Sequence, residues 1–131
     1  MRLSKLMALA VLAALYLVPT QASAKYACAV AEVFECTAIA GCKRVSAGQA
    51  NLPPMVTLNV KEKKLFSGLF GGDPLFEAGK VHEDEKILIL HGRQGLQTWT
   101  AVVDKGTGEM SGSISNLGRT FAQFGHCTPQ Q

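Results

Sequence analysis

The sequence is poor in aromatic residues and has almost no excess of charge. Aromatic side chains make up 7% of its 131 residues, with a single tryptophan, and the formal net charge is only +3. Acidic and basic residues are interleaved along the chain, and no apolar segment after residue 25 is long enough to cross a bilayer. We therefore expect no nucleic-acid partner, no polybasic membrane patch and no transmembrane anchor in the mature chain.

Sequence motifs of common enzyme classes are also missing. The chain contains no Gly-x-Ser-x-Gly elbow, no phosphate-binding glycine loop and no His-Glu-x-x-His helix. His126 stands beside Cys127, but neighbouring residues of a strand point to opposite faces, and a disulfide-bonded cysteine offers no thiolate. His82 and His91 close successive predicted strands, which would separate them by roughly 20 Å. We therefore predict no catalytic residue, no cofactor and no metal site.

The first 24 residues have the features of a secretory signal peptide. Arg2 and Lys5 precede an apolar run over residues 6–18, which is too short to span a bilayer. Pro19 ends that run, and Ala22-Ser23-Ala24 has the small residues that a signal peptidase requires. We predict a cleaved signal helix over residues 1–24, followed by one β-rich domain over residues 25–131.

All four cysteines lie in the predicted mature domain, and an even number in an oxidising compartment indicates two disulfides. Cys28 and Cys36 are too far apart to pair, since eight residues span roughly 26 Å in a strand and about 12 Å in a helix. Two of the three pairings remain. We favour Cys36–Cys42 with Cys28–Cys127, which joins the start of the first strand to the end of the last.

From residue 55 onward, short apolar or alternating segments are separated by turn residues, which is typical of an antiparallel sheet. Residues 110–115 alternate most clearly, with serines on one face and apolar residues on the other. We predict an all-β antiparallel barrel or sandwich of about seven to nine strands. The strands expected after residue 50 cover residues 55–60, 64–66, 75–82, 86–91, 96–104, 110–115 and 119–126.

Two local features leave alternatives open. Residues 26–45 fit a helical stripe as well as strand alternation, and we favour strands because Gly41 and the Cys36–Cys42 spacing suit a hairpin. In the last strand, alternation places Phe121 and Phe124 on opposite faces. Either a bulge near Gln123 or burial of both faces would reconcile them.

The pattern Cys28-x7-Cys36-x4-Gly41-Cys42, the segment 99–108 (WTAVVDKGTG) and the closing 124–129 (FGHCTP) resemble a group of small exported bacterial proteins. The resemblance covers most of the predicted mature chain. It implies export and a cysteine-containing β-rich domain, and it transfers no activity and no catalytic residue. Periplasmic lysozyme inhibitors are also small disulfide-tied barrels, but neither segment 67–71 (SGLFG) nor segment 111–115 (SGSIS) matches their Ser-Gly-x-x-Tyr loop.

The most unusual segment is residues 65–76, where glycine and proline indicate a loop that nevertheless holds three phenylalanines and three leucines. It either plugs one end of the barrel or presents Leu69 and Phe70 as a hydrophobic lip for a ligand or partner. We therefore expect a periplasmic or secreted, non-enzymatic binding or envelope-associated protein whose partner is a small ligand or an envelope protein. The alternatives are an inhibitor of an extracellular hydrolase such as a lysozyme, and a small enzyme with an unrecognised site.

Overall fold

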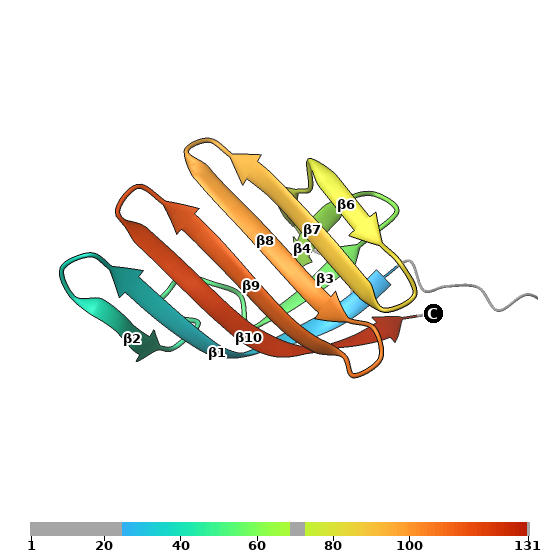
Figure 1. The fold of residues 1–131 in the computed structure, drawn as a ribbon, viewed down its shortest axis with the longest axis horizontal. Helices are drawn as coiled ribbons and strands as arrows, with labels where there is room; N and C mark the ends of the chain where they lie inside the picture. Colours follow the sequence, from blue (N-terminus) through green and yellow to red (C-terminus); the bar gives the residue numbers. More distant parts are fainter. Residues whose placement is uncertain (1–24, 69–72, 131) are drawn as a thin grey trace, which may run out of the picture.

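The computed structural model describes residues 25–68 and 73–130, and all regular structure in these ranges is β. Ten antiparallel strands form one sheet (Figure 1). They are β1 (Lys25–Thr37), β2 (Gly41–Val45), β3 (Met55–Asn59), β4 (Lys64–Ser67), β5 (Pro74–Glu77), β6 (Lys80–Glu83), β7 (Ile87–Gln94), β8 (Gln97–Asp104), β9 (Glu109–Asn116) and β10 (Arg119–Gln130). The predicted all-β antiparallel fold is therefore confirmed.

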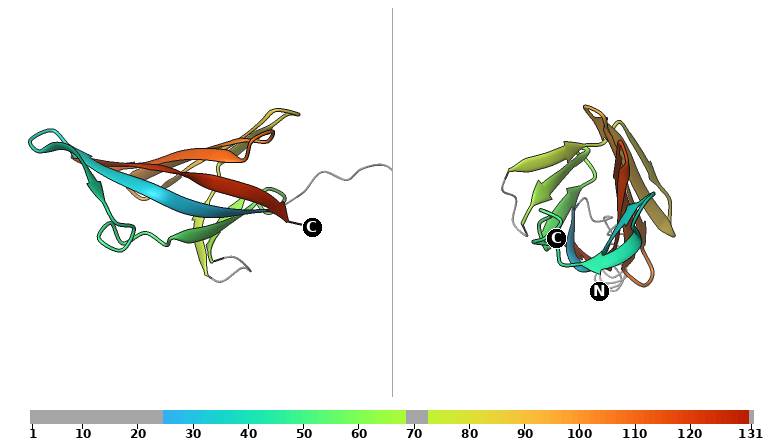
Figure 2. Two further views of the ribbon diagram at one scale, coloured as in Figure 1. Left: turned by 90° about the horizontal axis from the view of Figure 1, so that it is seen from below. Right: turned by 90° about the vertical axis from the view of Figure 1, so that its left-hand side faces the viewer.

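The sheet follows the order β5-β4-β3-β1-β10-β9-β8-β7-β6 and curls into a half-barrel (Figure 2). The long strand β1 pairs with β10 on one side, while its other side pairs with β3 in the first half and with β2 in the second half. Strands β7 to β10 form a regular meander of hairpins. Strands β1 and β10 therefore lie in the middle of the strand order.

The sheet has one strand more than expected, because the predicted strand 75–82 is two strands. Strand β5 pairs with β4, whereas β6 pairs with β7 at the opposite edge of the sheet. Ala78 and Gly79 connect the two, and their amides donate to the carbonyls of Lys63 and His91 respectively. The chain thus changes edges within two residues. The alternation breaks at this corner, because Ala78 is buried and the next residue packed on the core, Val81, lies three positions further on.

Residues 26–45 fold as the favoured hairpin, with β1 and β2 joined by the turn at 38–40. Neither alternative applies to Phe121 and Phe124, because β10 is unbroken and the two side chains lie on opposite faces, as strict alternation predicts. The register of β1 shifts between Val30 and Glu32 opposite an unbroken β10. Phe121 is buried, and Phe124 remains 46% exposed on the outer face. The expectation of a bulge in the last strand was therefore wrong.

The core fills the concave face of the half-barrel. Trp99, Ala101 and Val103 of β8 are buried there, as the alternation of that strand predicted. Side chains of β7, β9 and β10 that point to the same face pack in the same core. The other fully buried aliphatic side chains are Leu58, Leu88 and Leu90.

Both favoured disulfides are present. Cys28 is bonded to Cys127 across the paired strands β1 and β10, with 99 residues of sequence separation, and Cys36 to Cys42 with a separation of 6. Each bond joins directly opposite residues of an antiparallel ladder. Two disulfides are typical of a protein that matures in an oxidising compartment.

Candidate functional site

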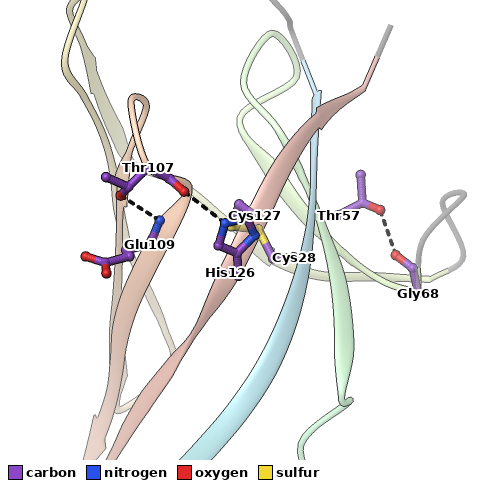
Figure 3. The surroundings of a disulfide bond; sticks show 7 residues. All are labelled: Cys28, Thr57, Gly68, Thr107, Glu109, His126 and Cys127. Atoms are coloured by element: carbon purple, nitrogen blue, oxygen red, sulfur yellow. Dashed lines mark hydrogen bonds between the residues drawn. A yellow bond between two sulfur atoms is a disulfide. The ribbon is translucent and has the colours of Figure 1, made fainter.

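The Cys28–Cys127 disulfide is surrounded by hydrogen bonds that stabilise the fold (Figure 3). Cys127 is 2% exposed, whereas His126 points away from it on the outer face, so the alternation expected for this pair is confirmed. The His126 Nε2 atom lies 2.9 Å from the carbonyl oxygen of Thr107, and the Cys127 amide donates to the Gly108 carbonyl at 2.7 Å. No cysteine is free, so the chain has no thiolate nucleophile.

The predicted hydrophobic lip, Leu69 and Phe70, lies outside the described residues. The segments on either side of it are held by hydrogen bonds. The Thr57 hydroxyl donates to the Gly68 carbonyl at 2.7 Å (Figure 3), and the Ser67 amide donates to the Asp73 carbonyl at 3.1 Å. These bonds fix Gly68 and Asp73 to the sheet at β3 and β4.

The concave face contains a narrow cavity of about 40 Å³. It is apolar, and the rings of Phe76 and Trp99 lie 5.5 Å apart in its wall. A ligand-sized pocket has about 300–1,000 Å³, whereas a single water needs only about 10–15 Å³. The cavity as it stands therefore accommodates a few waters and no larger molecule.

Within residues 25–68 and 73–130, two buried side-chain donors of this wall have no hydrogen-bond partner: Trp99 Nε1 and Gln123 Nε2. The indole nitrogen faces the seam between β5 and β7, where a methyl group placed on Gly92 would lie 2.8 Å from it. Gln123 belongs to the concave face between Val33 and Gly112. The buried interior also contains the polar residues Thr57 and Asn59.

The outer face of the sheet carries a larger hollow of about 660 Å³, which we call the Phe124 hollow. Small side chains, among them Ser111, form its floor, and Phe124 and Ile87 stand on opposite sides of it. A shallower hollow adjoins it and shares Val102, Ser111 and Phe124. The lining residues of the Phe124 hollow are Lys86, Ile87, Val102, Asp104, Glu109, Met110, Ser111, Phe124 and Gly125.

Aromatic contacts hold Phe124 in position. Its ring meets that of Phe34 edge to face, with centroids 6.2 Å apart. The Arg44 guanidinium lies 5.5 Å from the Phe34 centroid and forms an ion pair of 2.9 Å with Glu32. Such contacts restrict the rotamers of an exposed ring, so Phe124 is a rigid apolar feature of the surface. The sequence signalled it only through strict alternation, which places Phe124 on the face opposite Phe121.

Residues 25–68 and 73–130 contain no cluster of three or more His, Cys, Asp or Glu that could hold a metal ion. His82 lies 3.4 Å from Asp84. The pKa of Asp84 is lowered because its carboxylate accepts the amides of Lys86 and Ile87, with a smaller contribution from His82.

The prediction that His82 and His91 lie roughly 20 Å apart was wrong. His82 pairs with Ile89, and His91 pairs with Lys80, so the two histidines are diagonal neighbours on one face, roughly 7–8 Å apart. The ladder begins at Glu83 and Leu88, which places His82 farther into the sheet than its position at a predicted strand end suggested.

Comparisons with protein-family models, with curated proteins and with solved structures found no match. Among the described residues, no helix is both long and apolar enough to span a membrane.

Proposed function

We propose that this chain is an exported, non-enzymatic binding or envelope-associated protein of the periplasm or the extracellular medium. The predicted signal peptide, the resemblance to small exported bacterial proteins and the two disulfides support export. Two disulfides on a curved sheet also provide a rigid surface, which is favourable for binding because little order has to be gained when a partner docks.

We assign binding to the Phe124 hollow rather than to the interior. The observation that carries this assignment is Phe124 itself, an aromatic side chain 46% exposed beside a hollow of about 660 Å³. An exposed aromatic ring fixed by its neighbours is a common anchor of binding surfaces. The interior cavity, at about 40 Å³, is instead part of the packed core.

Native mass spectrometry of protein purified from its own envelope tests this function. Wild type should retain a small ligand or an envelope partner, and Phe124→Ser should lose it without a change in fold. Gln123→Leu is the matched interior control, because it removes an unpartnered buried donor at similar volume and should leave retention unchanged. Loss of retention in Gln123→Leu alone would assign the site to the interior cavity. Wild type that retains nothing would contradict the proposal.

A second candidate, inhibition of an extracellular hydrolase, is favoured by one observation. The Cys36–Cys42 disulfide closes a short loop whose tip residue, Ile39, is fully exposed, and a rigid protruding loop suits insertion into an enzyme cleft. The tip is apolar, however, and the chain lacks the inhibitory motif of the periplasmic lysozyme inhibitors. We therefore rank this function second.

A further inference from the structure

Three large aliphatic side chains are exposed at the tips of three hairpins. Ile39 lies in the turn between β1 and β2 and is 101% exposed, Leu96 lies between β7 and β8 at 80%, and Leu117 lies between β9 and β10 at 83%. Among the described residues, the remaining exposed large hydrophobic side chain is Phe124. We call these three residues the aliphatic rim.

The strand register brings the three tips to one end of the sheet. Thr37 pairs with Arg119, Arg119 pairs with Asn116, and the β7–β8 ladder ends at Gln94 and Gln97. Figure 1 shows the tips in line along the upper left margin of the sheet. Hairpins two strand spacings apart lie roughly 10 Å from one another, so the rim spans roughly 20 Å. Because any three points lie in one plane, a flat surface can contact all three tips at once.

Turn geometry does not require these aliphatic residues. Glycine supplies the positive φ that each turn needs, at Gly41 (70°), Gly95 (61°) and Gly118 (82°). Leu96 and Leu117 are adjacent to these glycines and Ile39 lies two residues before Gly41, and all three turn positions could hold polar residues, as turns at a protein surface normally do. Leucine and isoleucine there contribute nothing to the core, so their presence indicates contact with something apolar outside the molecule.

Cationic side chains flank the rim on both faces of the sheet. Arg93 lies on the outer face one residue before the β7–β8 turn, while Lys43 and Arg119 lie on the concave side. Arg44 and Arg119 form ion pairs with Glu32 (2.9 Å) and Glu35 (3.8 Å), so Lys43 and Arg93 supply the excess positive charge at the rim. These four cations lie far apart in the sequence, between residue 43 and residue 119, so no basic tract is visible along the chain.

From this combination we infer that the rim docks on a lipid bilayer whose surface carries anionic headgroups. Aliphatic side chains enter the interfacial region of the bilayer, and long cationic side chains reach the headgroups beside them. A row of single apolar tips bordered by positive charge matches a bilayer, in which an apolar region lies beneath anionic headgroups. The inference goes beyond the proposed function, because the Phe124 hollow lies on the face of the sheet and the rim lies at its end.

Vesicle flotation tests the inference with the disulfide-intact protein. Vesicles of phosphatidylglycerol mixed with phosphatidylcholine should carry the protein upward, and vesicles of phosphatidylcholine alone should carry much less. The triple variant Ile39→Ser, Leu96→Ser, Leu117→Ser should weaken partitioning by at least about tenfold. Phe124→Ser is the control for an exposed apolar residue outside the rim, and it should bind vesicles as wild type does while losing any partner of the hollow.

Charge variants separate the rim from general electrostatic attraction. Lys43→Gln with Arg93→Gln removes two charges at the rim, and Lys61→Gln with Lys80→Gln removes two exposed charges elsewhere. The first pair should reduce binding to the anionic vesicles several-fold, and the second should have little effect. Equal losses in both pairs would overturn the inference, because they would mean attraction to the protein as a whole.

Tryptophan substitution reports insertion directly. The native Trp99 is the only tryptophan and is 3% exposed, so brominated acyl chains should not quench it. Ile39→Trp, Leu96→Trp and Leu117→Trp should each be quenched in anionic vesicles. Quenching at only one tip, or at none, would overturn the inference. So would rim variants that change the oligomeric state in size-exclusion chromatography and leave vesicle binding intact, because the rim would then contact a second copy.

Discussion

The turns at the two ends of the sheet are built from different residue types. At the end that carries both termini of the described chain, aspartate side chains organise the turns. Asp84 accepts the amides of Lys86 and Ile87, and Asp104 accepts those of Gly106 and Thr107. At the rim end, glycines provide the turn geometry, and nearby positions hold exposed aliphatic residues.

The ends also differ in how strongly their turns connect to the rest of the fold. Lys105 ties the 84–86 turn to the next hairpin, since its Nζ donates to the Asp84 carbonyl at 2.9 Å and lies 3.3 Å from Glu83. Gly108 packs directly against β10. The rim turns have space around their glycines. Turns that are coupled to the core must satisfy packing, whereas uncoupled turns leave their side chains available for contact with a partner.

Breaking each disulfide should give the largest difference between the ends. Cys28→Ser with Cys127→Ser opens a link spanning 99 residues and should lower the free energy of unfolding by about 4–5 kcal/mol. Cys36→Ser with Cys42→Ser opens a link spanning 6 residues and should cost about 2 kcal/mol. Urea unfolding of both variants beside wild type measures the two losses. Equal losses would mean that the two ends are held with equal strength.

Two glycines with the same backbone angle give a sharper comparison. Gly108 and Gly118 both have φ of 82°, so alanine at either position meets the same strain of about 1–2 kcal/mol. At Gly108 the added methyl group would also lie 2.6 Å from His126 Nε2, whereas nothing lies within 4 Å at Gly118. We expect Gly108→Ala to cost about 3 kcal/mol and Gly118→Ala about 1 kcal/mol. Thermal or urea unfolding checks this, and similar costs would show that Gly108 is not packed as described.

The smallest expected effect concerns the pH dependence of the aspartate turn. Because the pKa of Asp84 is lowered in the folded protein, its contribution to stability is present above the ordinary value of 3.8 and is lost as the pH falls through the folded value. Asp84→Asn should therefore be less stable than wild type at pH 6, and the gap should close in acid. Urea midpoints between pH 6 and pH 2 test this. A gap that persists unchanged to pH 2 would contradict the role of the ionised carboxylate.

Much of the fold could be predicted from local pattern. Alternation in segments such as 110–115 and 97–104 placed the strands, and glycine with aspartate placed the turns between them. The disulfide pairing followed from chain distance and the expected meeting of the first and last strands. The corner at Ala78 and Gly79 was missed, because the residues on both sides of it favour strands and only the long-range pairing shows that these strands belong to opposite edges.

The candidate site was less predictable than the fold. The only site residues suggested by the sequence, Leu69 and Phe70, lie outside the described residues, and Phe124 was not among them. Alternation within β10 places Phe124 on the face opposite Phe121. That pattern does not say which of the two faces is covered by the rest of the sheet and which is exposed to solvent.

The sequence by itself determined where this chain is extended, where it turns and which cysteines can bond, because side-chain alternation and turn preferences act between close neighbours in the chain. Only the tertiary structure decided which distant segments share a surface. It gathered Ile39, Leu96 and Leu117 at one end of the sheet and brought His82 near His91. The physical reason is that the order and register of strands depend on burying one common face, and that condition belongs to the whole sheet rather than to any single segment.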